Sequence, residues 1–350
     1  MKITKIDFQR YDLRLKKPYT IAYEVVSHAT NFVLKLETGS GLIGYGCAAP
    51  DLPVTRETPA QVEEMIKDIL EPFLKGKNPF NYARLIAELK VFLPVRSSAL
   101  AMVDMALLDL VAKKADVPLY QYFGGFRDQI ETSITIGICD VEETLSEAEN
   151  FIQQGFRILK IKGGLEVELD IERMIKIKER FPQVVLRFDG NQGYSITEAI
   201  RFYEETKILG VEIFEQPIHV GKEEKMGELA SAISIPVMAD ESLKSLADTF
   251  RLISNERIDM INIKLMKVGG ILEGMHINSV AKSNKIEAMV GCLDESALGI
   301  SAGLHFALSR PNIHFADLDG HLDFENDPFT NLFHLEKGWL RPLERPGLGV

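Results

Sequence analysis

The chain has 350 residues, 46% hydrophobic and 26% charged, a composition that excludes fibrous, disordered and coiled-coil classes and allows about two domains. Its formal net charge is −11 without an offsetting basic run, so nucleic acid and anionic membrane surfaces are not expected partners. Three widely spaced cysteines and the absence of any apolar stretch near about 18 residues predict a reducing, cytoplasmic location and no membrane span.

The first part of the chain, residues 1–125, mixes strand and helix patterns. Alternating hydrophobic residues predict strands at 2–15, 31–38 and 42–47, with a glycine-containing turn joining the last two. Helical patterns follow at 59–74, 81–92 and 97–114. These elements predict a small α+β domain built on an antiparallel meander.

The next part, residues 126–320, is regular. Short apolar runs end at intervals of 24 to 28 residues, and a helical segment separates each run from the next. This alternation predicts an α/β fold in which eight parallel strands close into a (β/α)₈ barrel. The segment 321–350 shows no further strand pattern, and we expect it to return to the first domain. The eight predicted strands are 133–138, 158–162, 185–189, 212–216, 236–240, 260–264, 288–292 and 313–317.

Ionisable residues end almost all of these apolar runs. Because barrel enzymes carry their chemistry at the C-terminal ends of the strands, these side chains are expected to form one ring around the active site. A surface role would scatter them along loops. The ring consists of Lys160, Lys162, Asp189, Glu215, Asp240, Lys264 and Asp317, with Asp319 just beyond the last strand.

Three carboxylates of this ring come from consecutive strands, Asp189, Glu215 and Asp240. Carboxylate oxygens are the ligands that Mg²⁺ prefers, whereas Zn²⁺ usually requires histidine or cysteine. Three clustered carboxylates would also repel one another without a cation. The sequence therefore predicts a Mg²⁺ site.

Lysines lie on both sides of the predicted metal. Lys160 and Lys162 are two residues apart on one strand, so they point the same way, and Lys264 comes from the strand opposite. A second ammonium nearby and partial burial are expected to lower a lysine pKa and make it a usable base. Bases on opposite faces of a carbon suit a racemase or an epimerase.

Six motifs carry a resemblance to a known family. The segments 160–163 (KIKG), 187–193 (RFDGNQG), 215–217 (EQP), 238–242 (MADES), 262–267 (NIKLMK) and 317–319 (DLD) resemble the enolase superfamily, and more narrowly its dipeptide epimerases. The resemblance implies a modified TIM-like barrel with an N-terminal capping domain and a mobile loop after Lys17-Pro18-Tyr19. It implies an isomerase that inverts the C-terminal residue of a dipeptide through an enediolate. The sequence leaves open whether the chain assembles as a homo-oligomer.

The resemblance also implies residue roles. Asp189, Glu215 and Asp240 would bind Mg²⁺, and Lys162 and Lys264 would be the two acid/base residues of a 1,1-proton transfer. The dipeptide ammonium would be held by Asp317 and Asp319, and further substrate contacts would come from Thr135 and Lys160.

One position departs from the glutamate-specific members of that family. They carry an arginine in the capping loop that pairs with the substrate carboxylate, and Glu24 stands there in this sequence. Asp51 and Asp294 add two acids expected near the same opening. Together they favour a cationic or neutral side chain on the substrate. The alternatives are an L-Ala-D/L-Glu epimerase of peptidoglycan recycling or another racemase or lyase of the superfamily.

Overall fold

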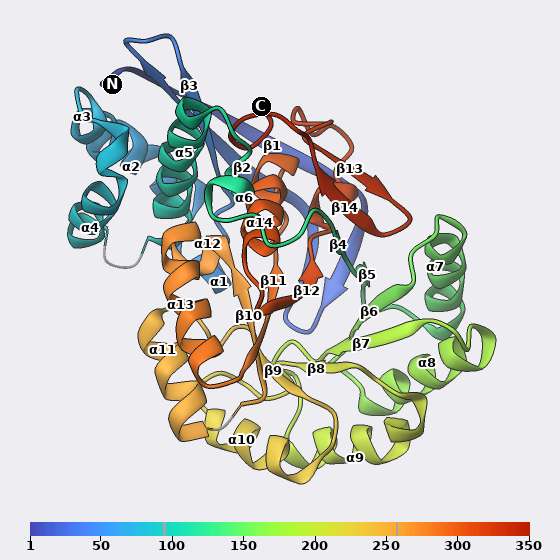
Figure 1. Cartoon of the computed structure of the whole chain (residues 1–350). Coiled ribbons are helices and arrows are strands. Elements are labelled where there is room, and N and C mark those ends of the chain that lie inside the picture. Colours follow the sequence, from blue (N-terminus) through green and yellow to red (C-terminus); the bar gives the residue numbers. More distant parts are fainter. Residues whose placement is uncertain (94–95, 257) are drawn as a thin grey trace.

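The computed structural model describes residues 1–93, 96–256 and 258–350. Figure 1 shows an N-terminal body of antiparallel strands and helices, drawn from blue to green, against a larger body of strands and helices, drawn from green to orange. The last residues, drawn in red, lie next to the N-terminal sheet.

The N-terminal sheet is an antiparallel meander of β1 (Ile3–Ile21), β2 (Glu24–Thr38) and β3 (Ile43–Ala48), as the alternating pattern predicts. β1 and β2 are longer than predicted and join in a tight hairpin in which Ile21 pairs with Glu24. Tyr19, Thr20 and Ile21 are therefore paired strand up to the hairpin tip, and the mobility expected after Lys17 stays a prediction. Near the hairpin tip the backbones of β1 and β2 remain paired, but most side chains are not buried. The sequence there therefore lacks the hydrophobic alternation that would predict a strand.

Helices cover one face of this sheet, and α5 (Ser97–Ala115) is buried along most of its length. β3 approaches α5 so closely that a Cβ atom at Gly46 would lie 1.9 Å from the carbonyl oxygen of Met102. Glycine is therefore required there. The remaining helical elements of this part are α1 (Leu52–Thr55), α2 (Pro59–Met65), a π-helical turn (Ile66–Leu70), α3 (Glu71–Leu74), a 3-10 turn (Pro79–Asn81), α4 (Tyr82–Phe92) and α6 (Leu119–Tyr122).

Eight parallel strands form the larger body and are hydrogen-bonded in sequence order. A bridge between Thr132 and Ala316 joins the two ends of the sheet and closes it. The predicted barrel is thus confirmed. Its strands are β5 (Ile134–Ile136), β6 (Ile158–Lys162), β7 (Val185–Asp189), β8 (Ile213–Glu215), β9 (Val237–Ala239), β10 (Met260–Lys264), β11 (Glu287–Gly291) and β12 (Ile313–Asp317).

Helices surround these strands on the outside, as Figure 1 shows. Residues two positions before the ring residues share their parity, so they face the barrel interior beneath the ring. Ile213, Met238 and Phe315 occupy such positions, and they form a buried apolar layer with Met260, four positions before Lys264, and Met289 of β11. The outer helical elements are α7 (Val141–Gln153), α8 (Val167–Arg180), α9 (Ile196–Thr206), a 3-10 turn (Lys207–Leu209), α10 (Glu223–Ala232), α11 (Leu246–Arg251), a π-helical turn (Leu252–Glu256), α12 (Leu265–Val268), α13 (Ile271–Ser283) and α14 (Ala297–Ser309).

The C-terminal segment corrects one prediction, because it does contain strands. After a 3-10 turn (Gly320–Asp323), β13 (Phe333–Glu336) and β14 (Trp339–Pro342) form a hairpin that pairs with β4 (Ile130–Glu131). The two turn residues, 337 and 338, both have positive φ, as in a tight two-residue β-hairpin turn. The strands that this turn joins are only four residues long. Strands this short carry too few alternating positions to be recognised from the pattern.

The end of the chain also contacts the N-terminal part. Leu119 N donates a hydrogen bond of 2.8 Å to Gly347 O, and Leu348 N donates one of 2.8 Å to the buried carboxylate of Asp109. The boundaries at residues 125 and 320 stay predictions. Within the described residues, no helix has both the length and the apolar character needed to cross a membrane.

Candidate active site

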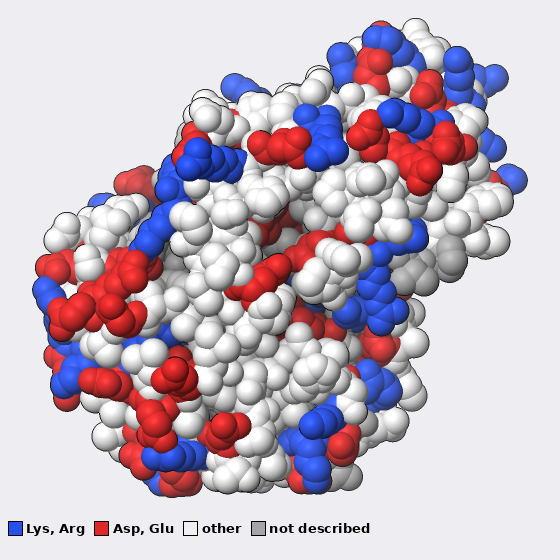
Figure 2. Space-filling model, turned by 180° about the vertical axis from the view of Figure 1, so that it is seen from behind, with Lys and Arg blue, Asp and Glu red and all other residues white. Residues whose placement is uncertain are grey.

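A cavity of about 440 Å³ opens at the C-terminal ends of the barrel strands, beneath the β1–β2 hairpin. Ten of the twelve predicted site residues line it, so the structure brings together positions from 24 to 319. Figure 2 shows acidic side chains in and beside a hollow on one face, without a large basic field. The lining residues are Glu24, Asp51, Thr135, Lys160, Lys162, Asp240, Lys264, Asp294, Asp317 and Asp319.

The ammonium group of Lys160 lies at the centre of the ring. Its Nζ atom lies 2.8 Å from Glu215 Oε2, 2.8 Å from Asp317 Oδ2 and 3.0 Å from Asp189 Oδ2. Asp189 and Glu215, the two predicted site residues that do not line the cavity, are buried around this ammonium. Both remaining oxygens receive backbone or side-chain donors: Asn191 N to Asp189 Oδ1, and Asn262 Nδ2 to Glu215 Oε1.

These contacts correct the expected lowering of the lysine pKa values. Burial by itself would lower the pKa of Lys160, but the surrounding carboxylates outweigh burial and hold that pKa well above its usual value. The pKa of Lys264 is raised in the same way, with Asp240 the largest opposing contribution to burial. The sequence argument considered the neighbouring ammonium groups and underestimated the carboxylates between them.

Asp240, which directly follows β9, is held by two ammonium groups. Lys264 Nζ lies 2.8 Å from Asp240 Oδ2, and the buried ammonium of Lys267 bonds Asp240 Oδ1. These lysines keep the pKa of Asp240 far below its usual value despite its burial. Lys267 was not predicted as a site residue, although it lies three residues after Lys264 on a short helix in the same motif.

Lys162 has a looser environment than Lys160. Its Nζ atom lies 3.6 Å from Asp189 Oδ2 and 3.4 Å from Asn191 Oδ1. Asn191 was missed as a site residue. It has a positive φ of 39°, a conformation that asparagine tolerates well. The available sequence signal was an asparagine in a glycine-containing segment directly after a predicted strand. Of the two lysines on β6, Lys162 therefore faces the cavity with fewer carboxylate partners than Lys160.

The carboxylates fit a divalent cation by ligand chemistry. They supply hard oxygen donors, and the groups nearest to the buried Asp189 Oδ2 are the Nζ atoms of Lys160 and Lys162, at 3.0 and 3.6 Å. Among the residues described, however, no three acidic, histidine or cysteine side chains stand close enough together to hold a metal ion. The Lys160 ammonium lies between Asp189 and Glu215, so an ion shared by these carboxylates requires Lys160 to move.

Asp317 and Asp319 lie beside the first barrel strand. Asp317 Oδ1 accepts a hydrogen bond of 2.7 Å from Ser133 Oγ, and Asp319 Oδ2 accepts one of 2.7 Å from Thr135 N. Burial and the adjacent Asp317 raise the pKa of Asp319 to about 6. A negative site of this kind favours an ammonium ligand.

Glu24, Asp51 and Asp294 meet at the cavity opening. Asp51 caps α1 through Val54 N, and Asp294 accepts bonds of 3.0 Å from the hydroxyl of Tyr19. Burial and the nearby Asp51 and Asp294 carboxylates raise the pKa of Glu24. Glu24 is the first residue of β2, at the hairpin tip. Unlike Asp51 and Asp294, its carboxylate accepts no hydrogen bond from the described residues.

Asp323 is a fourth acid on the same wall that sequence reasoning missed. It follows the last barrel strand by six residues and lines the cavity. Burial raises its pKa to about 8, with further contributions from Asp319 and Asp294. The fold places it there through the 3-10 turn after Asp319, which no motif in the sequence marks.

The closed barrel carries lysines and carboxylates around the C-terminal ends of its strands, and an antiparallel capping sheet covers this end. Residues 5–124 match the mandelate racemase / muconate lactonizing enzyme N-terminal domain, and residues 143–350 match the enolase C-terminal domain-like family. The chain therefore belongs to the enolase superfamily, as its motifs indicated.

Named relatives are epimerases. The L-Lys-D/L-Arg epimerase of Desulforapulum autotrophicum is 44% identical over 100% of this chain and 99% of its own length. The substrate-liganded structure of the L-Ala-D/L-Glu epimerase from Bacillus subtilis is 36% identical, with a TM-score of 0.97, covering 100% of this chain and 98% of that chain. These relatives confirm the prediction of an isomerase of the epimerase and racemase type.

A third relative was solved with its ligands. The dipeptide epimerase from Methylococcus capsulatus, complexed with Mg and the dipeptide L-Arg-D-Lys, has a TM-score of 0.96 and 38% identity. The match covers 100% of this chain and 99% of that chain. The predicted cofactor, Mg²⁺, is thus the metal found in this relative.

Proposed function

We propose that this protein is a Mg²⁺-dependent dipeptide epimerase that inverts the α-carbon of the C-terminal residue. The observation that carries the proposal is the placement of Lys162 and Lys264, which enter one cavity from β6 and β10 on either side of buried carboxylates. The dipeptide epimerases among the relatives support it.

The proton transfer uses one lysine as a base and the other as an acid. The neutral lysine removes the α-proton and becomes an ammonium, leaving the pair of electrons on the substrate as an enediolate. The opposite ammonium then donates a proton to the other face, so the configuration inverts with no net change in protons. When bound at Asp189, Glu215 and Asp240, Mg²⁺ supplies positive charge that stabilises the enediolate.

Other residues orient the dipeptide. We assign Asp319, with Asp317 beside it, to the substrate α-ammonium, and the backbone N–H of Thr135 donates a hydrogen bond to Asp319. Lys160 is bound by three carboxylates, and we assign it to the substrate carboxylate once a cation takes its place among them.

We assign cationic side chains to the preferred substrates. Glu24, Asp51, Asp294 and Asp323 line the cavity and would attract a cationic substrate side chain. A carboxylate side chain at the same place would be repelled by these acids. Two of the relatives described above carry lysine and arginine in their names or ligands, which agrees with this assignment.

A library experiment tests reaction and specificity together. L,L-Dipeptides incubated with enzyme and Mg²⁺ in D₂O gain one mass unit when their α-proton exchanges, so every substrate is detected at once. We expect exchange to be strongest for dipeptides with Lys or Arg at the C-terminal position. Preference for L-Ala-L-Glu would contradict the charge argument and favour the glutamate-specific alternative, and no exchange in any dipeptide would refute the proposed reaction.

A further inference from the structure

A second cavity, of about 600 Å³, lies outside the proposed substrate site. Its walls are the end of α1 with Arg56, the facing parts of α4 and α5, and the segments that follow β8, β9 and β10. The two cavities share only Val54 and Glu241 among their lining residues. This volume is in the range of sites that hold small ligands.

The second cavity is basic, although the whole chain carries a net charge of −11. Six cationic and four acidic side chains line it. Lys90 pairs with Glu273 at 2.5 Å, and Arg251 lies near Glu223 and Asp248 at 3.4 and 3.5 Å. Lys267 is engaged by Asp240, as described above.

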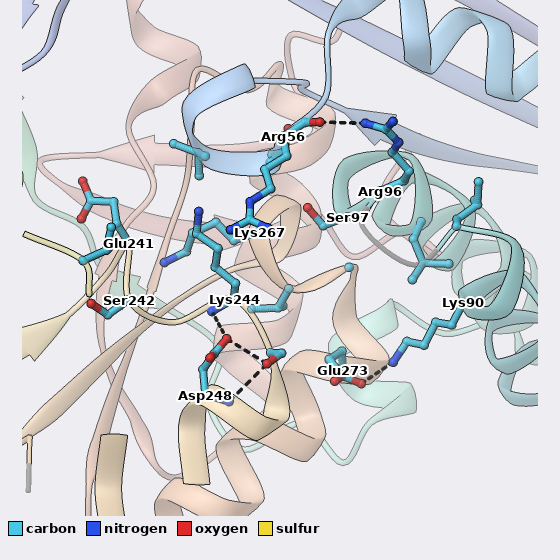
Figure 3. A pocket seen from close by; sticks show the side chains of 18 of the residues that line it. Arg56, Lys90, Arg96, Ser97, Glu241, Ser242, Lys244, Asp248, Lys267 and Glu273 are labelled. Carbon is cyan, nitrogen blue, oxygen red and sulfur yellow. Dashed lines mark hydrogen bonds and ion pairs between the residues drawn. The ribbon is translucent and has the colours of Figure 1, made fainter. Parts of the chain in front are cut away.

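Three cations remain without a carboxylate partner in the described part of the chain: Arg56, Arg96 and Lys244. Arg96 Nη1 donates to two neutral oxygens, at 2.7 Å to Arg56 O and at 3.2 Å to Gln61 Oε1. Figure 3 shows the Arg56 side chain extending from the end of α1 into the cavity beside Lys244, with the Lys90–Glu273 pair to one side.

The proximity of these groups has an electrostatic cost. Lys244 is half-buried, and its pKa is lowered by burial and then by Arg56, while Glu241, Asp240 and Asp248 oppose this shift without reversing it. Like charges that meet in a partly desolvated cavity are unfavourable unless an anion neutralises them. No carboxylate of the described chain does so for Arg56 or Arg96.

We propose that this cavity is a binding site for a small dianion, a phosphate ester or a dicarboxylate, held by Arg56, Arg96 and Lys244. Guanidinium groups bind the oxygens of both chemical groups through paired hydrogen bonds. Ser97 and Ser245 line the same cavity, and Leu93 and Leu100 provide an apolar surface for a short apolar part of the ligand.

The position of the site also links it to the proposed substrate cavity. Arg56 is the C-cap of α1, and Asp51, at the substrate cavity, is the N-cap of the same four-residue helix. A dianion bound to Arg56 would therefore contact one end of a four-residue helix whose other end is capped by Asp51 at the proposed substrate cavity. The assignment itself does not rest on the proposed epimerase activity, because it is tested by binding.

Titration calorimetry with inorganic phosphate and with succinate, at constant ionic strength set by KCl and with Mg²⁺ in excess, tests this site in the whole protein. We expect saturable binding of at least one dianion and a rise in melting temperature with its concentration. Binding of phosphate alone assigns the ligand to phosphate esters, and binding of succinate alone assigns it to dicarboxylates.

Variants locate the binding. Lys244→Gln and Arg56→Gln should each weaken it at least tenfold, and Arg56 is exposed, so its replacement leaves packing intact. Arg84→Gln is the matched control, because Arg84 pairs with Glu88 on the outside of α4 and does not line the cavity. The proposal is overturned if neither dianion binds saturably to the wild type, or if both cavity variants bind as tightly as the control.

Discussion

Lys264 Nζ lies 2.8 Å from Asp240 Oδ2, and both side chains are almost completely buried at the C-terminal edge of neighbouring barrel strands. A proposed proton carrier and a proposed metal ligand are thus in direct contact. Since the Asp240 carboxylate stabilises the charged form of Lys264, a divalent cation bound at Asp240 would reduce this stabilisation and lower the pKa of Lys264. Metal binding would then be coupled to acid–base chemistry at this pair.

Metal removal should abolish turnover. After dialysis against EDTA we expect no epimerisation, because the enediolate loses its positive charge, and Mg²⁺ should restore the rate. Asp189→Asn should lower kcat/KM on the order of a hundredfold or more, since several kcal/mol of charge stabilisation depend on the ion. Optical rotation follows the turnover. Full activity with verified metal removal would refute the metal requirement.

The two lysines should differ in the products they allow. Lys162→Ala and Lys264→Ala should each slow epimerisation by about 10²–10⁴, the contribution typical of a positioned acid or base. The remaining lysine should still exchange the α-proton of one epimer, and the two variants should select opposite epimers. Mass spectrometry in D₂O measures this. Lys176→Ala is the control, because Lys176 is exposed on α8. Wild-type epimerisation by Lys264→Ala would disprove the assignment.

Glu24→Gln should reduce the preference for cationic dipeptides. A partly screened ion pair contributes about 1 kcal/mol, so we expect kcat/KM for a Lys- or Arg-containing dipeptide to fall roughly fivefold. The value for L-Ala-L-Leu should not change. Glu179→Gln, which replaces an exposed glutamate on α8, is the matched variant. An equal decrease in kcat/KM for cationic and neutral dipeptides would show that Glu24 does not discriminate substrates by side-chain charge.

Asp323 should give the cationic substrates a particular pH dependence. Its pKa is raised to about 8 by burial, then by Asp319 and Asp294, so it is neutral at lower pH and becomes negative as the pH passes 8. Consequently, kcat/KM for a cationic dipeptide should rise between pH 7 and 9 relative to a neutral dipeptide. Asp323→Asn should remove this relative rise. An unchanged profile in the variant would exclude Asp323 from the recognition of charge.

Asp104 should make stability depend on pH. This fully buried carboxyl group of α5 accepts hydrogen bonds from Ile271 N and Leu272 N, and burial raises its pKa to about 7. An unfolded aspartate has a pKa near about 4, so the folded state binds the proton more tightly, and raising the pH from 4 to 7 lowers the free energy of unfolding.

The Asp104→Asn variant tests this linkage, since asparagine does not titrate. Its melting temperature relative to the wild type should increase from pH 5 to pH 8, by the equivalent of at most about 4 kcal/mol. Scanning calorimetry of both proteins at several pH values measures the difference. A pH-independent difference would mean that Asp104 is ionised in the folded protein across this range.

Local sequence patterns determined the barrel strands and the ring. The apolar runs are short, most of them carry an ionisable residue at or next to their end, and the closure of eight parallel strands places these ends on one edge by geometry alone. The positions of Asp189, Glu215, Asp240 and Lys264 at this edge could therefore be predicted. The hairpin of β13 and β14 could not, because its strands are too short to show a period.

Only the tertiary structure decided the electrostatics of the site. The sequence shows that lysines and carboxylates share a ring, whereas the folded chain places Lys160 within 3.0 Å of three carboxylates, which reverses the expected direction of its pKa. It also brings Arg56, Arg96 and Lys244 to one cavity from positions nearly 200 residues apart in the chain. Charge interactions depend on distance and burial, and neither quantity is contained in the order of residues.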